Sequence, residues 1–379
     1  MSVVDETTAS DLVDRLVEHL GPVCETGEEG PIASTVARRY RDLGQTVTRV
    51  GNSVVVGGPA RDRPQVLLVG HLDVVPPTDH DREPRVEERT DGQVVVGRGA
   101  SDMKGGNVVA MKLFEERRPG DPGDPDDPGD PYDPGDPYEL ALVLYGGEEG
   151  PAVTNELAAV LDEVAWLRSA DLAIILEPTD LEIQAGCLGG LHALLTFEGQ
   201  AAHSARPWHG DNALTKAGPF LTEFHRREPV RVTVDGIDYL DVWSVTQART
   251  ENPRNVIPPA FTVNLNYRFA PDRTLDQAER ELRDLVGDRA RVEIVDRAPP
   301  APPRLDAPVL RAFVAAVAGT VSAKQAWTDV ARFAEVGVPA VNFGPGLTAQ
   351  AHQAGEFVPV ANLVEAHARL ARFLQDDDA

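Results

Sequence analysis

Residues 64–76 read PQVLLVGHLDVVP, and this stretch decides the fold. Its apolar run, 66–69, stops at Gly70 and is followed by His71 and Asp73. A short apolar run bounded by Pro and Gly predicts a buried parallel strand, and ligand-binding residues of open α/β sheets collect where such strands end. Side chains two residues apart in a strand point the same way, so Asp73 can orient His71 and leave one ring nitrogen for a metal. On this stretch alone, simple loop capping by the two residues is an equally good interpretation.

The same pattern recurs along the chain. Three further apolar strands are predicted before metal-competent side chains: 140–145 before Glu148 and Glu149, 172–176 before Glu177, and 338–343 before His352. Asp102 stands just before an apolar helix predicted at 108–114, where backbone N–H groups orient a carboxylate. Four repetitions of this pattern make coincidence a poor explanation.

Two imidazoles and three carboxylates are thereby available to bind metal: His71, Asp102, Glu149, Glu177 and His352. If one carboxylate bridges two ions, each ion keeps one histidine and one further carboxylate. This N/O donor set suits a pair of Zn²⁺ ions about 3.5 to 4 Å apart, with positions left open for water and substrate. Asp102, at its rigid helix start, is the predicted bridge.

Glu148 is the carboxylate that remains after the metal ligands are assigned. Adjacent residues of an irregular loop can face different ways, so Glu149 can bind metal while Glu148 faces a metal-bound water as general base. An acidic solvated turn is the alternative interpretation of this pair.

Composition limits the possible classes of protein. The chain has 379 residues, which predicts two domains, and 42% apolar residues, enough for a packed core. The formal net charge is −25, which disfavours nucleic acid and anionic membrane as partners. The acidic start lacks the basic region of a signal peptide, so a cytoplasmic location is expected. Cys24 and Cys187 have no metal-ligand spacing and are expected to be reduced thiols.

Acidic residues outnumber basic ones by 61 to 36, and lysines number four. This balance favours a surface adapted to high salt, where ions screen the self-repulsion. An acidic protein from a GC-rich coding sequence is the alternative. The Asp-Pro repeat at 119–137 predicts an extended, solvated loop, because proline at that density prevents both helix formation and the hydrogen bonding of a β-sheet.

The middle of the chain has a different pattern from its flanks. Strands are predicted at 191–197, 242–248, 261–269 and 292–295, with helices at 212–226 and 275–285. The order βαββαβ is that of a split, ferredoxin-like unit. We therefore predict an α/β catalytic domain with a mostly parallel sheet, formed by 1–186 and 297–379, and an inserted α+β domain at 187–296.

The motifs GHLDVVP, GRGASDMKGG, Glu148-Glu149, Glu177-Pro178 and the late His352 resemble a family of dizinc amidohydrolases and peptidases. That family contains succinyl-diaminopimelate desuccinylases, acetylornithine deacetylases, aminoacylases and glutamate carboxypeptidases. The resemblance spans nearly the whole chain apart from the Asp-Pro insertion. It implies a dizinc exopeptidase-like fold, an inserted lid and dimerisation domain, and a homodimer formed through the lid.

The resemblance also implies a role for each matching residue. One metal is expected on His71, Asp102 and Glu177, and the other on Asp102, Glu149 and His352, with zinc as the ion and cobalt or manganese as alternatives. Asp73 would orient His71, and Glu148 would act as the base. His203, in GQAAHSARPWHGDNA, matches the lid histidine that reaches the substrate carbonyl, in dimeric members from the neighbouring subunit. His209 does not match that position and is expected to be a loop residue.

Within the family, WTDVARF at 327–333 and RNVIP at 254–258 resemble the actinobacterial-type desuccinylase branch. This resemblance implies hydrolysis of N-succinyl-LL-diaminopimelate in lysine biosynthesis, with Asn255, Arg268 and Thr328 on the substrate carboxylates. Arg268 could instead form a surface ion pair, and the other two could be loop hydrogen bonders. Where many desuccinylases carry an arginine pair at the start of the lid, this chain has Cys187 and Leu188.

Other functions remain open at this stage. Acetylornithine deacetylation, another N-acyl amino acid amidohydrolase activity, or dipeptide hydrolysis would use the same metal chemistry. A catalytically idle metal-binding relative is the alternative from another class, and intact Glu148 argues against it. A nucleotide-binding oxidoreductase is disfavoured because GRGASDMKGG lacks the GxGxxG spacing.

Overall fold

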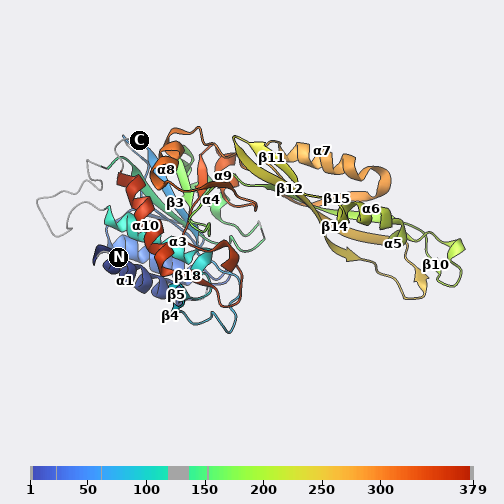
Figure 1. The fold of residues 1–379 in the computed structure, drawn as a ribbon, viewed down its shortest axis with the longest axis horizontal. Coiled ribbons are helices and arrows are strands. Elements are labelled where there is room, and N and C mark those ends of the chain that lie inside the picture. The colour runs from blue at the N-terminus through green and yellow to red at the C-terminus, as the bar shows by residue number, and fades with distance from the viewer. Residues whose placement is uncertain (1–2, 23, 61, 118–135, 152, 376–379) are drawn as a thin grey trace, which may run out of the picture. The chain divides into compact units, whose positions relative to one another are not determined.

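The computed structural model describes residues 3–22, 24–60, 62–117, 136–151 and 153–375 (Figure 1). Most of the predicted Asp-Pro loop at 119–137 lies outside these residues. The chain forms two compact units. Unit 1 comprises 1–185, 304–322 and 332–379, and unit 2 comprises 186–303 and 323–331. Compared with the predicted insertion at 187–296, unit 2 also contains Gly186, the proline-rich 297–303 and the segment 323–331.

Unit 1 is built around a mixed sheet, which in the described part of the chain has eight strands in the order β1-β2-β6-β3-β7-β17-β8-β16. Its strands are β1 (Val47–Val50), β2 (Ser53–Val56), β3 (Gln65–His71), β6 (Glu139–Tyr145), β7 (Leu172–Ile175), β8 (Ile183–Ala185), β16 (Val321–Ala323) and β17 (Ala340–Asn342). The central strands β6, β3, β7 and β17 are parallel. Every side chain of β3 and β6 is buried, which explains their continuous apolar sequences.

Parallel pairing brings the functional ends of these strands to one edge of the sheet. His71 at the end of β3 pairs with Tyr145 at the end of β6, and Val69 pairs with Ile175 of β7. A second, antiparallel sheet consists of β4 (Arg85–Arg89), β5 (Gly92–Val96) and β18 (Phe357–Pro359), none of which was predicted.

Helices pack around the large sheet of unit 1. They are α1 (Val3–Leu20), α2 (Gly30–Asp42), α3 (Gly105–Glu116), α4 (Leu157–Glu163), α8 (Pro308–Val317), α9 (Val330–Glu335) and α10 (Val360–Gln375), with short turns η1 (Ala100–Lys104), η2 (Ala165–Ser169) and η5 (Thr348–Gln350). Helices α1, α3 and α10 lie side by side, and α2 packs against β2 (Figure 1).

Unit 2 contains an antiparallel sheet with five strands among the described residues, in the order β11-β12-β14-β9-β15. They are β9 (Gly189–Glu198), β11 (Val230–Val234), β12 (Ile237–Arg249), β14 (Ala260–Phe269) and β15 (Arg291–Ala298). Without β11, the order β12-β14-β9-β15 is the ferredoxin-like order that the sequence predicted. The edge strand β11 was missed, although its alternating sequence VRVTV is typical of a strand.

The helices of unit 2 are α5 (Ala213–Lys216), α6 (Gly218–His225) and α7 (Leu275–Val286), with short turns η3 (Pro207–His209) and η4 (Gly287–Arg289). The single helix predicted at 212–226 is therefore wrong, because Pro219 lacks the N–H that would continue α5 and instead starts α6. An aromatic core joins these helices to the sheet, with Trp243 stacked on Tyr267 at 3.5 Å between ring centroids.

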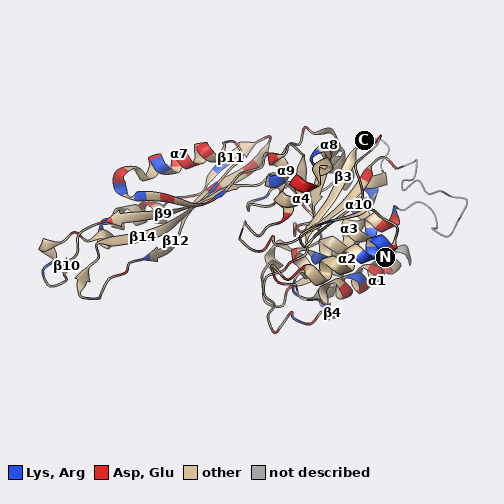
Figure 2. Cartoon of the chain, turned by 180° about the vertical axis from the view of Figure 1, so that it is seen from behind, with Lys and Arg blue, Asp and Glu red and all other residues tan. Residues whose placement is uncertain are grey.

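Charged residues of both signs line the exposed helices. Figure 2 shows acidic and basic residues interspersed along α7, whereas α1 carries mostly acidic residues, as their sequences require. Among the helices that the structure describes, none has the length and apolar character needed to cross a bilayer. Cys24 and Cys187 are buried free thiols, as expected.

Candidate metal centre at the carboxyl edge of the sheet

His71 is fixed at the end of β3 with Nε2 turned towards Asp102. Its side chain is fully buried, and Nδ1 lies 3.0 Å from the backbone carbonyl oxygen of Asp73. The Asp73 carboxylate is farther away, at 3.6 Å from Nδ1. The sequence predicted that the Asp73 carboxylate orients His71, but the Asp73 carbonyl oxygen is nearer to Nδ1 and therefore orients the ring. The other ring nitrogen, Nε2, lies 3.2 Å from an Asp102 carboxylate oxygen.

The Asp73 carboxylate organises the turn that carries Glu148 and Glu149. Its two oxygens accept the backbone N–H groups of Glu148 at 3.1 Å and Glu149 at 3.0 Å. The Thr26 hydroxyl donates a third hydrogen bond at 2.9 Å. Because Asp73 is fully buried and accepts three bonds, it ties β3 to the end of β6.

The Asp102 carboxylate lies between two imidazoles. One oxygen is 3.2 Å from His71 Nε2, and the other is 3.6 Å from His352 Nε2. His352 also contacts Glu149, with 2.8 Å between Nε2 and Oε2. Ligand atoms of His71, Asp102 and Glu149 all lie within 4.8 Å of one another. A chain of contacts therefore links four predicted ligands: His71 to Asp102, Asp102 to His352, and His352 to Glu149.

The electrostatic field of this group favours positive charge. Burial opposes protonation of His71, but its hydrogen bond to Asp102 and the nearby carboxylates of Glu148 and Asp73 raise its pKa well above 6.5. The hydrogen bond to Glu149 likewise raises the pKa of His352. Excess carboxylate around two imidazoles is the environment that a divalent cation would neutralise.

His352 and Glu177 complete the set of predicted ligands. His352 has a positive φ of 61°, an uncommon conformation for a residue with a side chain and one that collects at functional sites. Glu177 is 7% exposed. It lies two residues after Ile175, just as His71 lies two residues after Val69, and Val69 and Ile175 are paired between β3 and β7. It lies at the same edge, outside the group of three that is within 4.8 Å.

Glu356 holds the turn that presents Asp102, and sequence reasoning missed this role. One carboxylate oxygen accepts the backbone N–H groups of Ser101 at 2.8 Å and Asp102 at 2.9 Å. The other accepts Gly99 N–H and Arg98 Nη1, both at 3.0 Å. Burial raises the pKa of Glu356 to about 7, opposed by these backbone donors. The only signal in the sequence was an acidic residue four positions after His352.

Two further carboxylates, buried Glu29 and half-buried Glu156, support the turn at 146–149 and were also missed. Glu29 accepts the backbone N–H groups of Gly27 and Gly147 and the side chain of Asn52. Glu156 accepts the Ser53 hydroxyl at 2.6 Å. Nothing in the sequence pattern distinguishes these residues from surface carboxylates.

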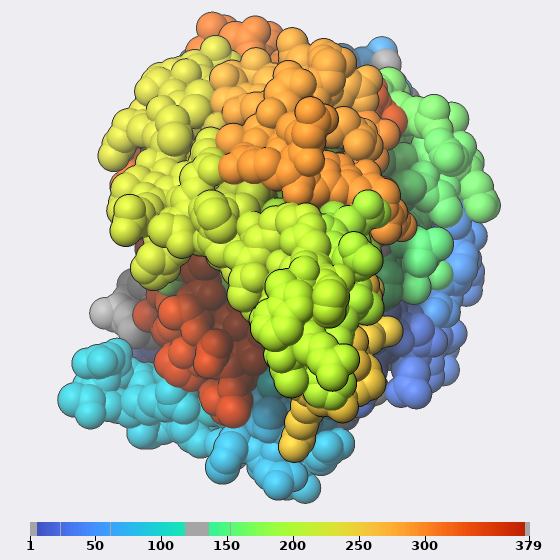
Figure 3. Space-filling model, turned by 90° about the vertical axis from the view of Figure 1, so that its right-hand side faces the viewer, coloured from blue at the N-terminus to red at the C-terminus, as the bar shows by residue number. Residues whose placement is uncertain are grey.

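The predicted residues of unit 2 fall into two groups at opposite ends of its sheet. His203 and Asn255 lie together, because β10 (Ala202–His203) pairs with β13 (Val256–Ile257). Figure 3 shows this lime-green segment beside a yellow one on the face turned to the viewer. His203 is exposed, and its Nδ1 accepts the Ala205 N–H at 3.0 Å, which leaves Nε2 as the N–H donor.

Arg268 and Thr328 belong to the other end of unit 2. Arg268 pairs with Gly190 across β14 and β9, and burial lowers its pKa, against the charges of Asp296 and Cys187. Thr328 is 3% exposed, and its Oγ1 has no hydrogen-bond partner in the described residues. Thr328 O accepts the Cys187 thiol at 3.8 Å. His209 is an exposed loop residue bonded to Trp208, as the sequence analysis expected.

Comparison with known proteins identifies the family. The sequence pattern of peptidase family M20/M25/M40 matches residues 67–376. This chain belongs to that family. The chain is accordingly an amide-bond hydrolase with the mixed α/β fold of that family, as the sequence motifs indicated.

Individual relatives cover nearly the whole chain. A Mycobacterium tuberculosis protein assigned as succinyl-diaminopimelate desuccinylase DapE is 37% identical over 92% of this chain and 94% of its own length. Succinyl-diaminopimelate desuccinylase of Corynebacterium glutamicum is 33% identical over 96% of this chain and 95% of its own. The YXEP protein of Bacillus subtilis, described as a dinuclear metal-binding peptidase, has a TM-score of 0.66 at 15% identity, with 98% of each chain covered.

Proposed function

We propose that the chain is a dinuclear metal-dependent amidohydrolase that removes the acyl group from an N-acyl amino acid. One observation carries this proposal: the Asp102 carboxylate directs one oxygen to His71 Nε2 and the other to His352 Nε2. A carboxylate between two imidazoles is placed to bridge two cations, each of which would take one histidine. The described dinuclear character of the Bacillus subtilis protein of similar fold supports the same interpretation.

The donor set fits two borderline divalent ions. His71 and Glu177 follow adjacent strands on one side, while Glu149 contacts His352 on the other. We infer that the first ion is held by His71, Asp102 and Glu177, and the second by Asp102, Glu149 and His352. Zinc suits these nitrogen and oxygen ligands, and cobalt or manganese would share them. Bound metal supplies Lewis-acid activation of the carbonyl and a water of lowered pKa.

Glu148 is the proposed general base. Its backbone N–H is fixed by Asp73, next to the ligand Glu149, so its carboxylate starts from an anchored turn. It would take a proton from the attacking water and deliver it to the leaving amine as the C–N bond breaks. The products are then a carboxylic acid and a free amine, which balances the addition of one water.

His203 is the proposed stabiliser of the substrate oxyanion. Its Nδ1 is occupied by the Ala205 N–H, so Nε2–H is the donor available to a developing negative charge. Asn255, beside it, and Arg268 and Thr328, at the other end of the unit, are the proposed contacts to substrate carboxylates. The unpartnered Oγ1 of buried Thr328 supports a role in binding a ligand.

N-succinyl-LL-diaminopimelate is the proposed substrate, with succinate and LL-diaminopimelate as products and lysine biosynthesis as the setting. Relatives at 37% and 33% identity with that assignment support it. N-acetylornithine is the second candidate, because Cys187 and Leu188 are uncharged and fully buried where many desuccinylases carry arginines. Both candidates use the same bond cleavage.

The test compares release of succinate from N-succinyl-LL-diaminopimelate with release of acetate from N-acetylornithine. Both reactions contain added Zn²⁺, at low and at molar KCl, so that a requirement for salt is detected. A higher kcat/KM for the succinyl substrate than for the acetyl substrate supports the proposed specificity. Preference for the acetyl substrate would move the enzyme to the deacetylase branch, and a dipeptide substrate tests the peptidase alternative.

The variant Glu148→Gln separates catalysis from metal binding. We expect it to lose at least about 100-fold in kcat, because general bases contribute roughly 10²- to 10⁴-fold. Its metal content, measured by elemental analysis, should equal that of the wild type. Unchanged turnover would exclude Glu148 as base, and inactivity of the wild type towards all three substrates would favour an idle metal-binding protein.

A further inference from the structure

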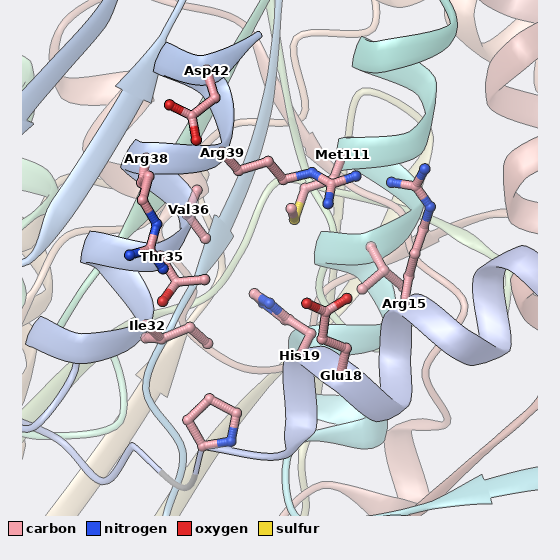
Figure 4. Close-up of a pocket in the computed structure, with 12 residues that line it drawn as sticks. Arg15, Glu18, His19, Ile32, Thr35, Val36, Arg38, Arg39, Asp42 and Met111 are labelled. Atoms are coloured by element: carbon pink, nitrogen blue, oxygen red, sulfur yellow. The ribbon is translucent and has the colours of Figure 1, made fainter.

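A hollow between α1, α2 and α3 of unit 1 shares no residue with the metal centre (Figure 4). Its volume is about 180 Å³. An apolar cavity of about 150 Å³ holds benzene, so there is room for a branched aliphatic or aromatic side chain. The apolar part of its lining consists of Ile32 and Val36 from α2 and Val108 and Met111 from α3.

His19 is the observation that points to a ligand in this hollow. Its side chain is only 8% exposed, and Nε2 has no hydrogen-bond partner among the described residues. Figure 4 shows the ring directed from α1 into the space beside α2. Burial, together with the charges of Lys104 and Arg39, lowers the pKa of His19 to about 3. The ring is therefore neutral near pH 7 and has one nitrogen that accepts a hydrogen bond.

Some charged residues of the hollow form ion pairs within the protein, and others do not. Arg15 and Arg39 both bind the Glu115 carboxylate, so their charges are partly neutralised. Arg38, Glu18 and Asp42 also line the hollow, and none of these three side chains forms an ion pair or hydrogen bond with the described residues. The hollow thus offers one guanidinium and two carboxylates that are not paired within the described residues, above an apolar floor.

We propose that this hollow binds an α-amino acid with an apolar side chain, in its zwitterionic form. Its carboxylate would pair with Arg38, and its ammonium group would donate to Glu18 and His19 Nε2. Its side chain would cover the four apolar residues of α2 and α3. An apolar anion would leave the carboxylates of Glu18 and Asp42 facing a like charge, and an apolar amine would do the same to Arg38, so the zwitterion satisfies more groups than either.

Calorimetric titration of the metal-loaded full chain tests the ligand class. Three probes share one apolar body: L-leucine, 4-methylpentanoate and 3-methylbutylamine. We expect L-leucine to bind at least tenfold more tightly than the other two. Equal or tighter binding of the acid or the amine would overturn the zwitterionic class. If none of the three probes gives a heat of binding at about 10 mM, a concentration above a millimolar Kd, the proposal of a binding site is overturned.

Two variants of α2 test the location. Val36→Phe fills the hollow, whereas Ser34→Phe adds the same ring on the exposed side of the helix. We expect L-leucine binding to vanish in the first and persist in the second, with amide hydrolysis unchanged in both. Because an amino acid is also the product class proposed for the metal centre, binding that survives Val36→Phe would overturn the assignment to the hollow.

A charge variant gives a second test that does not change the core. Arg38 and Arg41 are both exposed on α2, and only Arg38 lines the hollow. We expect Arg38→Ala to weaken L-leucine binding at least tenfold and Arg41→Ala to leave it unchanged. Equal affinities of these two variants would overturn the proposal even if Val36→Phe did not fold.

Discussion

At the scale of the residue, Asp73 shows how one buried side chain serves several functional groups. Its backbone carbonyl orients His71, while its carboxylate accepts the N–H groups of Glu148 and Glu149. The sequence indicated an interaction with His71, because the two residues share a face of the strand. It could not reveal that the carboxylate itself binds a turn 75 and 76 residues further along the chain.

The variant Asp73→Asn tests this role. An amide nitrogen cannot accept a hydrogen bond, so at least one of the two backbone N–H groups would lose its acceptor. We expect metal affinity or kcat/KM to fall about 10- to 100-fold, the usual cost of changing a residue that orients metal ligands. Thr26→Val, which removes only the hydroxyl donor to Oδ2, should have a smaller effect. An Asp73→Asn enzyme within twofold of the wild type would contradict the role.

His19 makes stability depend on pH in a predictable direction. The pKa of His19 in the folded chain is about 3, below its ordinary value of 6.5, chiefly because of burial. Between these values the unfolded chain binds a proton that the folded chain excludes, so acid favours unfolding. From pH 7 to pH 5 the free energy of unfolding should fall by about 2 kcal/mol more in the wild type than in His19→Phe. Urea unfolding at both pH values measures this, and equal losses would show that His19 titrates normally.

At the scale of the element, the turn 98–102 is positioned from a distant part of the chain. Glu356, immediately before β18, accepts three backbone N–H groups of this turn and the Arg98 side chain. Glu356→Gln would replace one acceptor oxygen with a donor. We expect roughly 10- to 100-fold weaker metal binding, since Asp102 would lose its fixed orientation. Metal titration with a chromophoric chelator measures the change.

A matched control for Glu356→Gln lies on α9. Glu335 is exposed, and Glu335→Gln makes the same chemical change away from the turn. Its metal affinity should equal that of the wild type. If both variants behave alike, Glu356 does not organise the metal site, and the loss of charge alone would account for any effect.

A structural feature could be predicted from the sequence when the residues that produce it lie close together in the chain. The strand at 65–71 could be predicted because all seven residues are buried and 66–69 form a continuous apolar run. His71, Glu149 and Glu177 could be proposed as metal ligands because they lie at or shortly after the ends of such strands. The role of Glu356 could not be predicted, because its partners are up to 258 residues away and a buried acceptor has the same sequence as a surface carboxylate. The break between α5 and α6 had a visible signal, the dipeptide Gly218-Pro219.

At the scale of the whole molecule, the proposed substrate residues of unit 2 cannot all meet one small ligand from a single chain. His203 and Asn255 lie beyond the start of β14 at Ala260, whereas Arg268 is near its end. Eight residue steps of strand separate Ala260 from Arg268, which is about 26 Å. A substrate that contacts both groups would need them from two copies of the chain, which supports the homodimer expected from the family.

Mixing two inactive variants tests this arrangement. Glu148→Gln lacks the proposed base and His203→Ala lacks the proposed oxyanion donor, so each homodimer should be nearly inactive. If His203 acts on the metal centre of the partner subunit, a hybrid dimer contains one complete site. Random exchange makes half of the dimers hybrids, so activity should recover to about a quarter of the wild type. No recovery, with exchange verified by differently tagged chains, would mean that His203 acts within its own subunit or takes no part in the reaction.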